Sequence, residues 1–180
     1  MTAITLYHGT IHDFTAIDLS RGGPFKDFGK GFYASRTESQ AERIAVRDRG
    51  FRDDLLLGNG EKPVARAWVL AYEFDSDKLD ELNVKEFIGP GEEWARFVVK
   101  NRSSRERRHD YDVVIGPTAN DDTNVVVQAF MNRVFGDPDS ELAIRTFLRF
   151  ILPDRLPAQF FFGTSRAAAL LRLIGRRAMG

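Results

Sequence analysis

Three histidines are the first residues of the sequence whose type and spacing could do chemistry. His8 and His12 have the spacing of two zinc ligands on one helix face. Gly9 breaks such a helix and replaces the glutamate that this motif uses as its base. Because the chain has no cysteine, a metal would depend on carboxylates such as those in residues 120–122. A turn and a helix cap are the simpler interpretation of that segment, so we predict no metal site.

A glycine-rich segment matches phosphate-binding motifs in residue type but not in its predicted structural context. Residues 29–34 match G-x-G-x-x-A, but this dinucleotide fingerprint needs a buried strand before it and a helix that opens inside it. Residues 26–28 do not form such a strand, and the pair Ser35 and Glu38, spaced as a capping box, starts the helix later. Gly23 and Gly29 enclose five residues, whereas a nucleotide-triphosphatase loop encloses four. Neither fold is predicted.

Arginines gather in two places, and phosphates or an acidic partner could bind there. The two clusters are Arg102, Arg105, Arg107 and Arg108, and Arg166, Arg172, Arg176 and Arg177. A solvated face is the favoured interpretation, because most charge runs are solvated and the 26 basic residues balance 26 acidic ones. A nucleic-acid-binding module that uses Arg102 to Arg108 is a lower-ranked hypothesis.

The elements that must position these residues are read from periodicity and turn signals. Residues 4–8 alternate as a strand that ends at Gly9 and Thr10, and the breaker-rich residues 18–31 predict an exposed loop. The remaining expectations are helices over 36–47, 92–102, 123–134 and 140–152, strands over 64–74, 82–88, 111–115 and 157–163, and a last amphipathic helix marked by Leu170, Leu171 and Ile174. This mixture predicts an α+β protein.

Length and composition set the frame. At 180 residues the chain is expected to form one domain, residues 1–180. Residues 1–10 lack the pattern of a signal peptide, and no apolar run approaches the roughly 20 residues of a membrane span. We therefore expect a cytoplasmic protein with no membrane partner, or one delivered into a target cell without a signal peptide.

Several motifs in a fixed order carry a family resemblance. The first strand holds YHGT (residues 7–10), and about two dozen residues later GKGFYAS (29–35) precedes a helix. This pair resembles the ADP-ribosyltransferases of the diphtheria-toxin and poly(ADP-ribose) polymerase type. EWARFVVKNR (93–102), YDVVIGPTANDD (111–122) and LPAQFF (156–161) make the chain more closely similar to a bacterial domain family of unknown function with a predicted ADP-ribosyltransferase fold, often met in toxin-like gene neighbourhoods.

The resemblance implies a fold and an activity. The fold would have two small, mainly antiparallel sheets flanked by helices. NAD would be the substrate, and the ADP-ribose acceptor would be a protein or a nucleic acid. A toxin or effector role, with an antitoxin as partner, is implied in the same way.

The resemblance also implies roles for individual residues. His8 would bond the adenosine-side ribose of NAD, Gly9 would pair its backbone with the nicotinamide amide, and Tyr33 would stack on the nicotinamide ring. Gln159 would orient the reacting ribose, which makes His8, Tyr33 and Gln159 the candidate catalytic set. The loop from Arg21 to Gly31 would cover NAD. Thr10, Arg21, Lys30 and Gly31 would complete the NAD-binding set. The cation near the pyrophosphate of NAD would be Arg21, Lys26 or Lys30.

The chain departs from the transferases at two positions. Gln159 stands where a glutamate is usual, and an amide can hold a ribose hydroxyl but cannot act as a base. Glu93 is a spare carboxylate, and Phe28 or Phe51 could replace a second aromatic that often sandwiches nicotinamide. These departures keep a second hypothesis open: a recognition module of the same fold that binds NAD without turnover.

Overall fold

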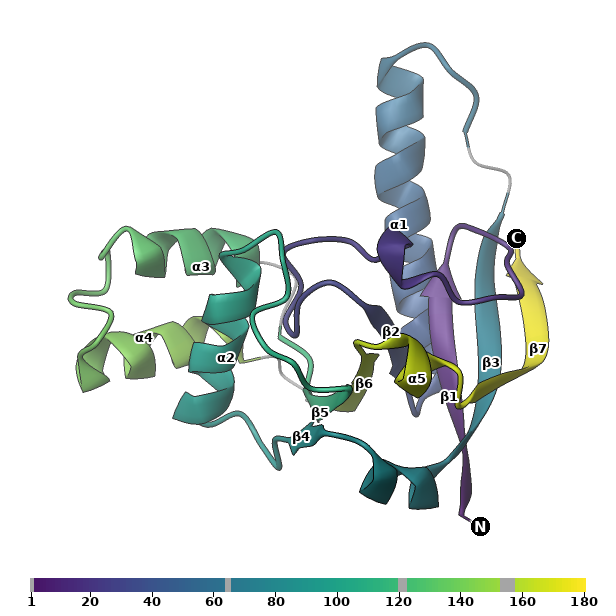
Figure 1. Ribbon diagram of the computed structural model, residues 1–180. Coiled ribbons are helices and arrows are strands. Elements are labelled where there is room, and N and C mark those ends of the chain that lie inside the picture. Colours follow the sequence, from purple (N-terminus) through teal and green to yellow (C-terminus); the bar gives the residue numbers. More distant parts are fainter. Residues whose placement is uncertain (1, 64–65, 120–122, 153–157) are drawn as a thin grey trace.

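One open sheet of seven strands forms the centre of the computed structural model, which describes residues 2–63, 66–119, 123–152 and 158–180. The strand order is β4-β5-β6-β2-β1-β3-β7 (Figure 1). β4 and β5 are parallel and the other neighbours are antiparallel. The strands are β1 (Ala3–Thr10), β2 (Phe32–Ser35), β3 (Ala67–Asp75), β4 (Val84–Glu86), β5 (Val113–Pro117), β6 (Ala158–Phe162) and β7 (Leu171–Met179).

The expectation of two small sheets is therefore wrong, although the sheet has a narrow point. β1 pairs with β3 along its full length of eight residues, and β2 pairs with β6 along four. Between β1 and β2 only Tyr7 and Ser35 are in register. The sheet is continuous because of that pair, and the two strands separate beyond it.

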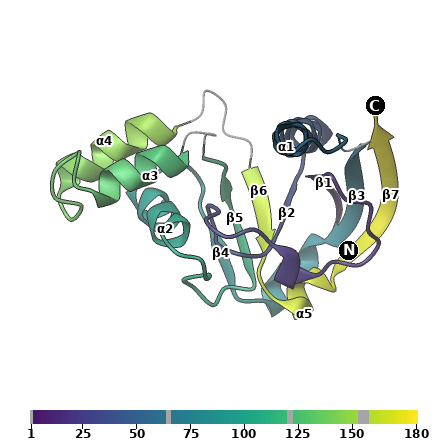
Figure 2. The ribbon, with the colours of Figure 1, turned by 90° about the horizontal axis from the view of Figure 1, so that it is seen from above.

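Helices cover the sheet in two groups (Figure 2). α2 (Glu92–Arg102), α3 (Thr123–Met131) and α4 (Glu141–Ile151) pack together beside β4, β5 and β6. α1 (Glu38–Gly58) packs on β1 and β3, and its later turns stand clear of the sheet (Figure 1). Short helical turns η1 (Leu19–Arg21), η2 (Ser76–Glu81) and α5 (Ser165–Ala168) complete the chain.

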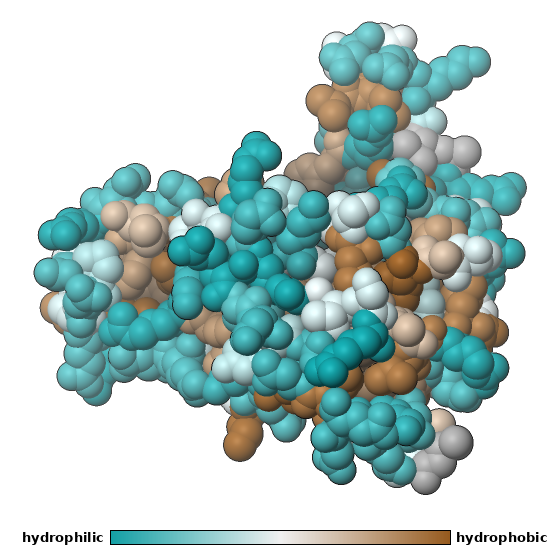
Figure 3. All heavy atoms as spheres, in the orientation of Figure 1, coloured by the Kyte–Doolittle hydropathy of each residue, from teal (hydrophilic) through white to brown (hydrophobic). Residues whose placement is uncertain are grey.

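Two hydrophobic clusters fill the two faces of the sheet, because successive side chains of a strand point to opposite faces. The first cluster lies under α2, α3 and α4 and contains Trp94, Phe147 and Phe161. The second contains Leu6, Phe32 and Tyr72 from the central strands, among others. Figure 3 shows apolar atoms on the projecting part of α1, where Phe51, Leu55 and Leu57 are exposed.

Most of the predicted elements are confirmed, with four corrections. The helix expected over 36–47 is α1, which continues to Gly58. The loop expected to be exposed over 18–31 buries Asp27 and Phe28. Leu170 to Ile174 do not form a helix: from Leu171 the chain pairs with β3 as strand β7. Leu170, Leu171 and Ile174 have helical spacing, whereas Leu171 and Leu173 have the period of two of a strand, and pairing with the edge of β3 decides between the two patterns. The capping box is also wrong, because Ser35 lies in β2, where its hydroxyl donates to the Thr37 carbonyl, and α1 starts at Glu38.

Candidate functional site

The polar groups of the candidate site gather where β1 and β2 separate. His8 on β1 donates a hydrogen bond from Nδ1 to the Tyr33 carbonyl oxygen on β2, at 2.7 Å. This side-chain bond takes the place of the ladder bonds that the two strands no longer share beyond Tyr7 and Ser35. The structure thus brings two of the three predicted catalytic residues together, through the side chain of one and the backbone of the other.

The His8 imidazole is held neutral. Its half-buried ring packs on Phe32, with centroids 4.4 Å apart, and on the edge of Phe14 at 5.8 Å. Burial lowers the pKa of His8 from its ordinary 6.5 to about 4, against the opposing effects of the Tyr33 carbonyl and of Asp48. Because Nδ1 carries the proton, Nε2 is a hydrogen-bond acceptor, and no described residue donates to it.

Tyr33 ties β2 to the glycine-rich loop. Its hydroxyl donates to the Gly29 carbonyl at 2.6 Å and accepts from the Phe28 backbone N–H at 3.1 Å. Its ring meets Phe161 edge-on, with centroids 5.1 Å apart, in the first hydrophobic cluster. Burial raises the pKa of the Tyr33 hydroxyl well above its ordinary value, so it stays a neutral donor.

Neither candidate for a second nicotinamide-stacking aromatic has a free face beside Tyr33. Phe28 stacks with Tyr33 at a centroid distance of 6.4 Å but is 0% exposed, so a ligand ring between them would displace the core. Phe51 is 70% exposed on the projecting part of α1. The spare carboxylate, Glu93, pairs with Lys85 of β4, and three strands lie between β4 and β1.

The rings of His8 and Tyr33 face opposite sides of the sheet. Phe32 and Tyr33 are consecutive on β2 and belong to different clusters, and the imidazole packs on Phe32. Gln159 shares the face of Tyr33, because Ser35 is its partner across β2 and β6. The three predicted catalytic side chains therefore do not share one face of the sheet: the His8 ring lies on one face, and the Tyr33 ring and Gln159 lie on the other.

Gly9 and Thr10 have structural roles at the end of β1. A Cβ on Gly9 would lie 1.9 Å from the Ala41 carbonyl oxygen of α1, so only glycine allows α1 to pack this closely. Thr10 accepts a hydrogen bond from the His12 backbone N–H at 3.1 Å and stabilises the turn after the strand. The residue types at both positions are explained without a ligand.

The predicted covering loop closes on itself at two glycines. A Cβ on Gly22 would lie 2.7 Å from the Gly31 carbonyl oxygen, and one on Gly31 would lie 2.3 Å from the Phe161 ring. Arg21 and Lys30, beside these glycines, both lower the pKa of Asp18, after its stronger hydrogen bonds with Ser20. Two of the three candidate pyrophosphate contacts, Arg21 and Lys30, therefore lie near the same carboxylate.

Lys26 has a different environment from these two cations. Burial lowers its pKa, and Asp48, Arg47, Arg102 and Asp27 are the charges around it. It thus belongs with the charged groups beside α1 and α2 rather than with Arg21 and Lys30.

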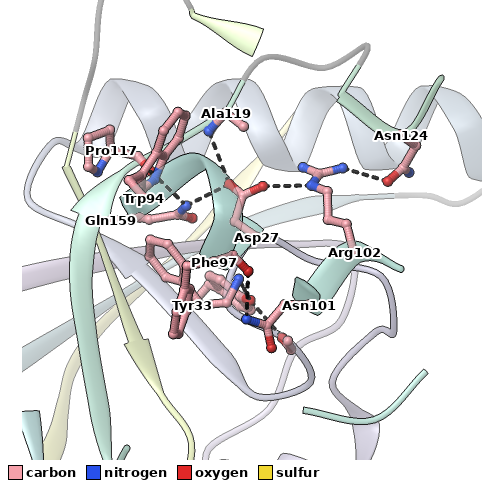
Figure 4. A network of polar contacts seen from close by, with 12 residues as sticks. Asp27, Tyr33, Trp94, Phe97, Asn101, Arg102, Pro117, Ala119, Asn124 and Gln159 are labelled. Atoms are coloured by element: carbon pink, nitrogen blue, oxygen red, sulfur yellow. Dashed lines mark hydrogen bonds and ion pairs between the residues drawn. The ribbon is translucent and has the colours of Figure 1, made fainter. Parts of the chain in front are cut away.

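Gln159 is part of a buried network that the sequence alone did not indicate (Figure 4). Its Nε2 donates to Asp27 Oδ2 at 2.8 Å and to the Pro117 carbonyl at 3.4 Å. Asp27 is 4% exposed and also accepts from Arg102 Nε at 2.6 Å and from the Ala119 N–H at 3.0 Å. Nothing in a glycine-rich loop distinguishes a buried aspartate from a turn residue, so Asp27 was missed.

The arginine clusters are largely committed to partners within the protein. Arg102 also donates to Asn124 at 2.7 Å, and Arg107 donates to the Gly163 carbonyl. Each of the four arginines of the C-terminal cluster pairs with a carboxylate, on Asp112, Glu73, Asp13, Glu38 and Glu42. Few of these cations remain for phosphates, which weakens the nucleic-acid hypothesis.

The surface has a hollow away from these residues that a ligand could enter. This hollow of about 600 Å³ lies between residues 15–20, Tyr72 and the segment from α5 to Leu171. Within the described ranges there is no cluster of three metal-ligating side chains and no helix suited to crossing a bilayer. Residues 120–122, the carboxylate segment considered for a metal, lie outside the described residues.

Fold and site together define an α+β protein in which His8 and Tyr33 are hydrogen-bonded where an open sheet narrows to one residue pair, with Gln159 on the neighbouring strand β6. A family model described as a protein of unknown function (DUF3990) matches residues 4–173. The chain belongs to this family, which confirms the predicted membership in a family of unknown function. The searches of curated proteins and of solved structures gave no match.

Proposed function

We propose that this protein is an NAD-dependent ADP-ribosyltransferase that acts on a protein or nucleic-acid acceptor. The observation that carries the proposal is the bond from His8 Nδ1 to the Tyr33 carbonyl at the separation of β1 and β2. It fixes the imidazole with Nε2 as an acceptor at the only place in the described sheet where two neighbouring strands share a single registered pair.

The division of the side chains between two faces suits a dinucleotide. NAD has two riboses, and their hydroxyls are hydrogen-bond donors. His8 Nε2 offers an acceptor on one face of the sheet for the adenosine-side ribose, and Gln159 offers an amide on the other face for the nicotinamide ribose. Arg21 and Lys30 would meet the pyrophosphate.

The reaction needs one bond to break and one to form. The bond between nicotinamide and C1′ of the ribose breaks, and its electron pair leaves with nicotinamide. The cationic sugar carbon is then captured by an acceptor nucleophile, which loses its proton to solvent. The protein would contribute by gripping the ribose more tightly in the transition state than in the ground state.

Nicotinamide release from labelled NAD tests this proposal. The wild type is compared with His8→Asn, Tyr33→Phe and the matched control His12→Asn, an exposed histidine four residues away. Release by the wild type and the control, with a loss of at least tenfold in the His8 variant, supports it. Absence of release and of label transfer to lysate protein or nucleic acid contradicts it.

A second candidate function is NAD recognition without transfer. The network around Gln159 favours it, because the residue is an amide that cannot act as a base and its Nε2 is already bonded to Asp27. A rise in melting temperature with NAD, without nicotinamide release, would select this function, since a ligand that binds only the folded state stabilises it.

A further inference from the structure

We propose that Asp27 is a positioning residue for the transferase reaction: it turns the Gln159 side chain so that Oε1, and not Nε2, faces the ribose. This inference rests on the proposed function and goes beyond it, because it assigns a role to a buried aspartate on a different segment of the chain.

The orientation follows from the donors and acceptors around the amide. An ionised carboxylate only accepts hydrogen bonds, and Arg102 pairs with the Asp27 carboxylate at 2.6 Å. Gln159 therefore turns its N–H end to Asp27 Oδ2, where the distance is 2.8 Å, and to the Pro117 carbonyl, a second acceptor. With both neighbours accepting, the reversed amide would set oxygen against oxygen.

Asp27 is itself held from three directions. Arg102 of α2 approaches Oδ1, and the Ala119 backbone N–H and the Gln159 amide approach Oδ2 (Figure 4). Arg102 is fixed in turn by Asn124 of α3. Because α2, β6 and the segment after β5 each supply a donor, the Asp27 carboxylate has little freedom to turn away. Its hydrogen bond to Gln159 is therefore a rigid constraint.

The remaining amide atom is the one that a ligand can use. Gln159 is 8% exposed, and no described residue donates to its Oε1. Among the described residues, the fully buried side-chain atoms that lack a hydrogen-bond partner are Gln40 Oε1 and the Tyr72 hydroxyl, and Gln159 Oε1 is not one of them. It offers an acceptor to a donor such as a ribose hydroxyl, and the negative charge of Asp27 polarises the amide toward that oxygen.

The test exchanges the carboxylate of Asp27 and the amide of Gln159, so that the hydrogen-bond donor and acceptor change places. In Asp27→Asn the new amide can donate, so it no longer forces the Gln159 N–H inward. In Asp27→Asn combined with Gln159→Glu, the new Asn N–H faces a carboxylate, which again presents an oxygen to the ribose. Asp13→Asn is the matched control, because Asp13 pairs with an arginine on the exposed surface.

Steady-state nicotinamide release is measured for the full chain and for each variant, with melting temperatures to establish folding. We expect Asp27→Asn to lower kcat about tenfold with KM within twofold, and the exchanged pair to regain most of the wild-type kcat. Gln159→Ala combined with Asp27→Asn should be no slower than Gln159→Ala alone, because Asp27 acts through Gln159. The control should match the wild type.

The outcomes separate this inference from the function on which it rests. Two results overturn the positioning role and leave the transferase function intact. One is nicotinamide release by the wild type with an unchanged kcat in Asp27→Asn. The other is a loss of kcat in Asp27→Asn combined with Gln159→Ala that equals the product of the two single losses. If Asp27→Asn fails to fold, the exchanged pair decides alone, and a folded but slow exchanged pair overturns the inference. No release by the folded wild type overturns both.

Discussion

Acid should destabilise this protein through His8. The folded state holds the imidazole neutral with a pKa of about 4, whereas an unfolded chain titrates near the ordinary 6.5. Above pH 6.5 neither state binds the proton, and the site contributes its full stability. As the pH falls from 6.5 toward 4 the unfolded state takes up a proton that the folded state excludes, so stability is lost.

The size of the effect follows from this pKa difference. Between pH 8 and pH 5 the linkage relation predicts a loss of about 2 kcal/mol in the free energy of unfolding, from His8 alone. His109, whose pKa is lowered mainly by burial, acts in the same direction. The contribution of His8 must therefore be isolated with a variant.

Urea unfolding at pH 8 and pH 5 measures it, for the wild type, His8→Asn and His12→Asn. Asparagine keeps a side-chain N–H for the Tyr33 carbonyl but does not titrate. The wild type and the His12 variant should lose about 2 kcal/mol more than the His8 variant on going to pH 5. An equal loss in all three proteins would refute a neutral, desolvated imidazole at this position.

Three further predictions concern packing and charge. Gly9→Ala should cost about 3 kcal/mol in urea unfolding through overlap with the Ala41 carbonyl. Gly50→Ala, whose new Cβ would meet no described atom within 4 Å beyond its own helix backbone, should gain up to about 1 kcal/mol as a better helix former. Tyr72→Phe should leave the melting temperature unchanged or raise it, because the buried hydroxyl has no partner among the described residues; a fall of several degrees would contradict this. The Arg166 guanidinium, with smaller contributions from Thr164 and the Asn83 N–H, holds the pKa of Asp112 far below its usual range against the effect of burial. Arg166→Ala should therefore move the midpoint of acid unfolding, measured by circular dichroism, to a higher pH. An unchanged midpoint would contradict the role given to Arg166.

Local patterns predicted most of the elements because local interactions determine them. The alternation in residues 4–8 and the turn at Gly9 and Thr10 define β1, and the apolar spacing of Trp94, Phe97 and Val98 defines one face of α2. At Leu171 to Ile174 two periods fit equally well, and the free edge of β3 selects the strand. A nonlocal partner decided this case, and a single sequence does not display it.

The residues of the candidate site also fall into those that local motifs predict and those that depend on nonlocal contacts. His8, Tyr33 and Gln159 were found from motifs, and the structure puts the first two in contact at one strand separation. Asp27 was missed because its importance comes from Arg102, Ala119 and Gln159, which lie 75, 92 and 132 residues away in the chain. Spacing in one sequence carries no information about contacts of that range.

The structure also shows which motif residues are explained by packing and which keep atoms available for a ligand. A glycine at position 9 is required by the Ala41 carbonyl, so it would stand there whether or not the protein binds NAD. Packing does not explain the Nε2 of His8 and the Oε1 of Gln159 in the way that it explains Gly9. Both atoms are hydrogen-bond acceptors, and no contact within the described residues uses them. Two acceptor atoms on opposite faces of the sheet suit a ligand with hydroxyl donors at two separated points. These two atoms, and not the glycines, are where substitutions should separate binding from folding.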